Sequence, residues 1–173
     1  MTPPADKTIW SATVNKKSVE LLINSNAVLL DVLRDQVGTL GVKRGCDLGT
    51  CGCCTVMIDG EPRLSCLCLA GQVSKTSITT VEGLADGAHL APIQACFAKY
   101  GGSQCGFCTP GFLVASQALL VDNPSPTDQE IAEAIEGNLC RCTGYQQIIE
   151  SIQEAAKICL LYTSDAADDT CCG

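Results

Sequence analysis

Residues 46–54 read CDLGTCGCC and place four cysteines within nine positions. The whole chain holds 14 cysteines in 173 residues, a fraction that a small disulfide-rich scaffold could also reach. Such scaffolds are secreted and poor in core, whereas this chain is 46% hydrophobic. Its first ten residues, MTPPADKTIW, lack the basic and apolar regions of a signal peptide. We therefore expect a cytoplasmic chain whose thiols bind metal.

Charge and hydropathy exclude two classes of partner. The formal net charge is −8 and the isoelectric point is about 4.5, so no basic surface is expected for nucleic acid. The apolar run GFLVASQALLV (111–121) is shorter than the roughly 18 residues of a membrane span. We expect the partner to be protein.

The first half, residues 1–83, has the alternating pattern of β-strands. TIWSATV (8–14), SVELLIN (18–24), TVMID (55–59) and TSITTV (76–81) read as strands, with hairpin turns at NKK and at Asp59-Gly60. LLDVLRDQ (29–36) places Leu29, Val32 and Leu33 on one helical face. Strands around one helix predict a small β-grasp domain, so the predicted fold class is α+β.

The second half, residues 84–158, has helical periodicity. Four segments begin at Pro92, at Thr109-Pro110, at the Thr127–Glu130 capping box and at Thr143. They predict a four-helix bundle in which the first and third connections lie at the same end. That topology brings Cys105 and Cys108 to Cys140 and Cys142.

The spacing Cys46-x4-Cys51-x2-Cys54 is typical of the loop that holds a plant-type [2Fe–2S] cluster. Spacing alone leaves the fourth ligand open between Cys66 and Cys68. A zinc site more often uses two short pairs, and a Rieske centre needs two histidines whereas the chain has one. Glycines at 45, 49 and 52 allow the backbone to curl around a cluster and donate N–H groups to it.

The second set of thiols, Cys105-x2-Cys108 with Cys140-x-Cys142, would suit zinc as well as iron–sulfur when taken alone. Beside a ferredoxin-type loop, a second redox cluster is the better interpretation, because two neighbouring clusters can pass electrons between them.

The chain carries four cysteine motifs in the order GCDLGTCGCCTVMIDG, SCL, QCGFCTPG and GNLCRCTGY. With these motifs in this order, it resembles the iron–sulfur small subunit of the molybdenum hydroxylases. The resemblance implies a ferredoxin-like domain and a helical domain with one [2Fe–2S] cluster each, and it selects Cys66 as the fourth ligand of the first. It also implies a large molybdopterin-binding partner next to the helical cluster and a medium FAD-binding partner. Electrons would pass from molybdenum through both clusters to flavin or another acceptor. Gln104 stands where relatives approach the pterin, and its amide can donate and accept hydrogen bonds.

The residues alone leave two other functions open: a free-standing two-cluster electron carrier and a zinc-stapled structural module. The remaining cysteines Cys53, Cys68 and Cys96 are expected to pack as small hydrophobic residues.

The segment 159–173, CLLYTSDAADDTCCG, resembles the translation of a transposase sequencing adapter. We expect it to be such an extension or a disordered tail, and we give its cysteines no role.

Overall fold

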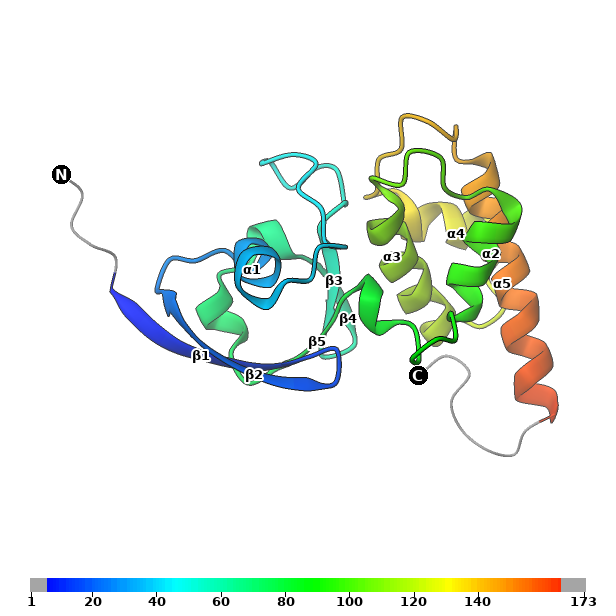
Figure 1. Cartoon of the computed structure of the whole chain (residues 1–173). Helices are drawn as coiled ribbons and strands as arrows, with labels where there is room; N and C mark the ends of the chain where they lie inside the picture. The colour runs from blue at the N-terminus through cyan, green and yellow to red at the C-terminus, as the bar shows by residue number, and fades with distance from the viewer. Residues whose placement is uncertain (1–5, 166–173) are drawn as a thin grey trace.

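The computed structural model of the chain describes residues 6–165. A sheet-containing unit and a helical unit lie side by side, joined by one connection near residue 84 (Figure 1). The sheet unit contains β1 (Lys7–Val14), β2 (Lys17–Asn24), α1 (Leu29–Asp31), η1 (Val32–Val37), β3 (Thr55–Ile58), β4 (Glu61–Leu64), η2 (Ser65–Leu67), η3 (Ala70–Val73), β5 (Ser77–Thr79) and η4 (Val81–Gly83). The helical unit contains α2 (Pro92–Tyr100), α3 (Thr109–Asp122), α4 (Asp128–Ile135) and α5 (Gln146–Asp165).

Five strands form one mixed sheet in the order β2-β1-β5-β3-β4. β1 and β5 pair in parallel, and the other neighbours are antiparallel. Both predicted hairpin turns are present: Asn15 and Lys16 have φ of 49° and 66°, and Asp59 and Gly60 have 51° and 88°. Positive φ at both central residues is the mark of a type I′ turn. The second turn leads into β4, a short strand that the alternation did not predict.

The predicted helix packs on this sheet as α1 and its continuation η1, which has the wider π-helical turn. Leu29, Val32 and Leu33 are fully buried, as the helical periodicity predicted. They join Trp10 of β1, also fully buried, in the first hydrophobic core. The β-grasp prediction is confirmed by this arrangement of sheet and helix.

The helical unit is a bundle with its own core, built on residues such as Phe97, Phe112, Ile131 and Ile152. Gly101, with φ of 74°, ends α2. Thr127 caps α4 as predicted: its hydroxyl accepts from the Glu130 N–H, and its N–H donates to the Glu130 carboxylate at 2.7 Å. Among the described helices, none combines the length and apolar character that a membrane crossing requires.

The last helix differs from its prediction at both ends. It begins at Gln146 rather than Thr143, because Gly144 and Tyr145 have positive φ of 64° and 70°. It also continues to Asp165, past position 158 where the predicted helical half ends, and Cys159 is 1% exposed. Residues 166–173 of the expected tail lie outside the described residues.

Candidate metal centres

The first group of thiols comes from the loop before β3 and from η2. Hydrogen bonds from the backbone N–H groups of Leu48 and Thr50, and then from Cys51, lower the pKa of Cys46 to about 6. Burial, the adjacent Cys54 thiol and the more distant thiols of Cys46 and Cys51 raise the pKa of Cys66 to about 12. Cys66 thus lies beside Cys54 and within electrostatic range of Cys46 and Cys51, as the fourth thiol of such a site would.

Cys68 is placed differently from Cys66. Burial raises the pKa of its thiol, the Arg63 guanidinium opposes the rise, and Cys54 adds to it. Cys68 is half-buried and packs against the first hydrophobic core. Its position supports Cys66 over Cys68 as the fourth thiol of the group.

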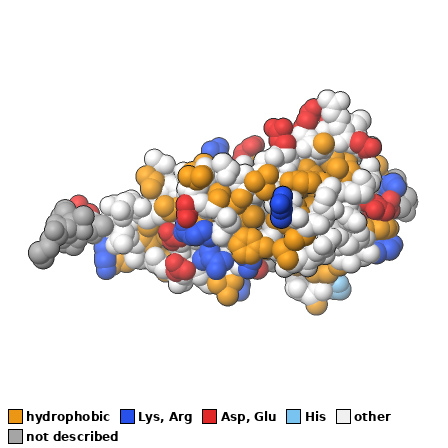
Figure 2. Space-filling view, turned by 90° about the horizontal axis from the view of Figure 1, so that it is seen from above, with side chains coloured by type: hydrophobic (Ala, Val, Ile, Leu, Met, Phe, Trp, Pro, Cys, Tyr) orange, Lys and Arg blue, Asp and Glu red, His pale blue; other side chains and the backbone are white. Residues whose placement is uncertain are grey.

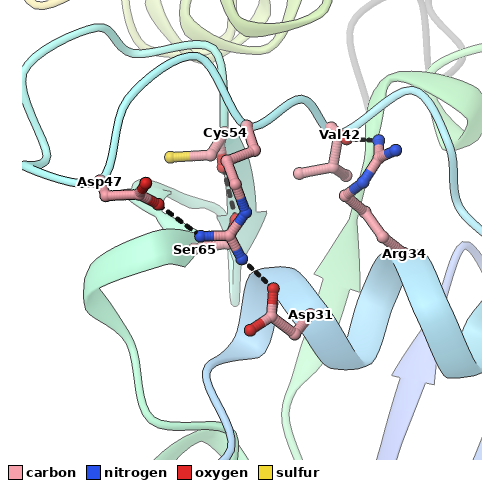
Figure 3. A network of polar contacts seen from close by, with 7 residues as sticks. Asp31, Arg34, Val42, Asp47, Cys54 and Ser65 are labelled. Carbon is pink, nitrogen blue, oxygen red and sulfur yellow. Dashed lines mark hydrogen bonds and ion pairs between the residues drawn. The ribbon is translucent and has the colours of Figure 1, made fainter.

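Two arginines hold the cluster loop to the helix that precedes it (Figure 3). Arg44 forms ion pairs with Asp31 of α1 and, at 2.6 Å, with Asp47 inside the loop. Arg34 of η1 donates to the carbonyl of Val42 at 2.5 Å. These contacts fix the entry of the loop. Neither arginine was predicted as a loop anchor, because neither stands in the cysteine pattern.

The end of the loop is fixed by hydroxyl groups. Ser65 is fully buried, and its hydroxyl donates to the carbonyl of Cys54 at 2.7 Å (Figure 3). Thr55 donates through its hydroxyl to the carbonyl of Gly52, also at 2.7 Å. The strand β3 and the segment that carries Cys66 are thereby tied to Gly52 and Cys54 at the end of the loop.

The second group of thiols forms where the bundle topology predicted. The Sγ atoms of Cys105 and Cys142 lie 3.6 Å apart and both residues are exposed. Burial and the neighbouring Cys140 thiol raise the pKa of Cys108 to about 12. Two loops separated by more than thirty positions thus bring two pairs of thiols together at one end of the bundle.

Thr143 holds Cys140 in a thiolate-stabilising environment. Its N–H and its hydroxyl donate to the Cys140 Sγ at 3.4 and 3.1 Å. Burial opposes ionisation of Cys140, yet these two hydrogen bonds leave its pKa below the ordinary value. Donors to a ligating sulfur stabilise the negative charge of an iron–sulfur cluster.

The residues present fit [2Fe–2S] clusters. Such a cluster is bound by four thiolates, two on each of its two irons. Each group supplies four cysteines. In the second group the sulfurs lie in two neighbouring pairs, Cys105 with Cys142 and Cys108 with Cys140. Within residues 6–165, no three His, Cys, Asp or Glu side chains converge as ligands of a single metal ion.

A cleft of about 460 Å³ lies between the two groups. From the first unit it is lined by Gly45, Cys51 and Cys53, and from the second by Phe107, Leu139 and all four cysteines of the second group, among others. Cys53 is 4% exposed, as expected for a packed thiol, and its sulfur lies close to Gly45. Cys96 is also buried, within α2.

Direct contacts join the two loops beside this cleft. The N–H of Leu139 donates to the carbonyl of Cys51 at 2.9 Å, and the Asn138 amide donates to the carbonyl of Gly52 at 3.0 Å. Gly111 of α3 allows the close approach, since a Cβ there would lie 2.2 Å from the Gly52 carbonyl oxygen. Asn138 was not predicted, because its partner is 86 positions away.

Two family models match the chain. A 2Fe-2S iron-sulfur cluster binding domain covers residues 4–98, and a [2Fe-2S] binding domain covers residues 80–153. The small subunit of nicotine 6-hydroxylase from Paenarthrobacter nicotinovorans is 46% identical over 152 residues, which is 88% of this chain and 92% of that protein. The chain belongs to the iron–sulfur small subunits of the molybdenum hydroxylases.

Other relatives of the subunit agree with this membership. Caffeine dehydrogenase subunit gamma from Pseudomonas sp. strain CBB1 is 47% identical, covering 86% of this chain and 90% of that one. In the crystal structure of quinoline 2-oxidoreductase from Pseudomonas putida 86, one chain matches with a TM-score of 0.86 and 43% identity, covering 90% of this chain and 97% of that one. The predicted fold, a ferredoxin-like domain followed by a helical [2Fe–2S] domain, is confirmed, as is the role of an electron-transfer subunit of an oxidoreductase.

Proposed function

We propose that this subunit carries electrons from a molybdopterin site on a large partner subunit to FAD on a medium subunit or to another acceptor. Cys105, Cys108, Cys140 and Cys142 hold the cluster that receives the electrons. Cys46, Cys51, Cys54 and Cys66 hold the cluster that passes them on. The observation that carries this assignment is that Cys51 of the first group lines the same cleft as all four cysteines of the second group, and that the Leu139 N–H donates to the Cys51 carbonyl.

The chain itself supplies positions and hydrogen bonds. A bound [2Fe–2S] cluster takes up and releases one electron at a time. Leu48 and Thr50 direct N–H groups at Cys46 in the first group, and Thr143 does the same for Cys140 in the second. Donors to cluster sulfurs favour the reduced, more negative state and so set the potential at which each cluster accepts an electron.

One end of the molecule offers a surface for the large subunit. Seen from above, hydrophobic side chains gather across the middle of this face (Figure 2). Phe107 and Leu139, which line the cleft beside the exposed Cys105 and Cys142, are 46% and 52% exposed. Exposed apolar patches of this kind mark interaction sites. A partner that covers them would bring its own cofactor next to the second cluster.

Gln104 directly precedes Cys105 in the chain and is exposed. We assign it the pterin contact, because its amide can donate and accept hydrogen bonds at the edge of a pterin. We also place the assembled enzyme in the cytoplasm, where reducing conditions keep these thiols available for clusters.

Co-expression with the large and medium subunits tests the proposal. We expect the three chains to purify together with molybdenum, and Phe107→Asp to weaken that association. Ile9→Asp, which places the same charge on an apolar side chain of β1 that is 68% exposed, is the matched control and should leave the complex intact. A loaded two-cluster monomer that binds no partner would instead support a free-standing electron carrier.

A further inference from the structure

Tyr145 has a backbone conformation that its side chain disfavours. Its φ is 70°, directly after Gly144 at 64°. A left-handed conformation costs a non-glycine residue roughly 1–2 kcal/mol and persists where the surroundings hold it. Here the Tyr145 carbonyl accepts the N–H of Ile149 at 2.9 Å, and its ring packs edge-to-face on the buried Phe112, with centroids 5.9 Å apart. The residue is thus anchored to both α5 and α3.

The phenol of Tyr145 joins the two ends of a three-residue segment. It accepts the N–H of Cys140 at 3.1 Å and donates to the carbonyl of Asn138 at 3.2 Å. One hydroxyl group therefore uses both its acceptor and its donor capacity on the backbone that carries a second-group thiol. Substitution by Phe would keep the ring contact with Phe112 and remove both hydrogen bonds.

The segment that the phenol holds is the one that reaches the other domain. Its middle residue, Leu139, donates its N–H to the carbonyl of Cys51, and the Asn138 side chain donates to the carbonyl of Gly52. Because Leu139 is bonded directly to Cys140, this route connects a first-group cysteine to a second-group cysteine through a single hydrogen bond. Any displacement of residues 138–140 changes that connection.

We propose that Tyr145 is a positioning residue for electron transfer between the two clusters. Its hydroxyl fixes residues 138–140 so that the Leu139 N–H stays on the Cys51 carbonyl and the Cys140 sulfur keeps its place in the second cluster. The proposal rests on the cluster ligands assigned under the proposed function, and it adds the group that sets the distance between the clusters.

The test compares the holoprotein with its Tyr145→Phe variant. We expect hydrogen exchange at the Leu139 amide to be about tenfold faster, the factor that corresponds to one hydrogen bond of about 1.4 kcal/mol. Electron transfer between the clusters after photoreduction should slow. The midpoint potential of the second cluster, followed by electron paramagnetic resonance, should shift while that of the first stays the same.

Tyr100→Phe is the matched control. This substitution also removes a phenol oxygen, which in Tyr100 donates a hydrogen bond to the Glu154 carboxylate on α5 at 3.2 Å. It should leave the exchange of the Leu139 amide, the transfer rate and both potentials unchanged. Replacement of Tyr145 by 4-aminophenylalanine restores a hydrogen-bonding group and should recover both the potential and the transfer rate. If Tyr145→Phe fails to load its second cluster, recovery of that cluster in the 4-aminophenylalanine variant would still support the positioning role of Tyr145.

An unchanged rate and potential in a fully loaded Tyr145→Phe variant would overturn the proposal, as would a lost cluster that the amino analogue does not recover. Neither result touches the proposed function, which would fail only if the unaltered protein lacked two clusters.

Discussion

At the scale of single residues, Cys66 is assigned as the fourth ligand of the first cluster, and Cys68, two positions along the chain, is not. We predict that Cys66→Ala loses the first cluster, because the Cys66 thiol lies beside Cys54 and within electrostatic range of Cys46 and Cys51. Iron content should fall from about four to about two atoms per chain, and the visible absorption should fall with it.

Cys68→Ala and Cys53→Ala are the matched controls for this loss. Both thiols are outside the assigned ligand set, Cys53 as a packed side chain between the sites and Cys68 beside Arg63. Both variants should keep about four irons per chain. Loss of the first cluster's absorption in Cys68→Ala would show that the assignment is reversed.

At the scale of elements, the N-terminal end of α3 must approach the first cluster loop without a side chain. Alanine in a helix is normally about 1 kcal/mol better than glycine. At position 111 its Cβ would meet the Gly52 backbone oxygen at 2.2 Å. We therefore predict that Gly111→Ala destabilises the protein by roughly 2 kcal/mol, as overpacking does, and lowers the midpoint of thermal unfolding.

Gly137→Ala is the control for this substitution, because a Cβ at position 137 would meet nothing within 4 Å. It should leave the unfolding midpoint almost unchanged. Equal midpoints of thermal unfolding for the two variants would mean that the close approach between α3 and the loop does not limit which side chain position 111 can carry.

The start of α4 depends on the capping box of Thr127 and Glu130. Thr127→Ala removes the hydroxyl that accepts the Glu130 N–H, and it should cost about 1 kcal/mol of stability. Thermal unfolding of the holoprotein measures this loss. Ser at position 127 keeps a hydroxyl and should restore most of it, and an alanine variant as stable as the parent would contradict the role of the cap.

At the scale of the whole molecule, local patterns predicted the parts and topology predicted how the second set of thiols assembles. Alternation located β1 and β2, paired turn residues located both hairpins, and the bundle connections placed Cys105 near Cys142. Apolar residues at helical spacing likewise predicted the face of α1 and η1 that packs into the core.

Contacts between distant residues could not be predicted in this way. The parallel pairing of β1 with β5, the ion pairs of Arg44 and the reach of Asn138 to Gly52 depend on segments that share no local pattern. Tyr145 stood in the quoted motif GNLCRCTGY, yet its hydrogen bonds to Cys140 and Asn138 follow from a left-handed turn that no periodicity signals. The helix end at Asp165 is not predictable from the sequence, because the composition changes at position 159 while the helix continues.

We infer that this one chain holds two [2Fe–2S] clusters, one in each domain, whose loops are joined by the hydrogen bond from Leu139 to Cys51. The most direct measurement combines iron and zinc analysis with a reductive titration of the anaerobically purified protein, followed by electron paramagnetic resonance. We predict about four irons per chain and two separate signals, each integrating to about one spin. A colourless, zinc-loaded protein, or one with two irons and a single signal, would contradict the presence of two [2Fe–2S] clusters.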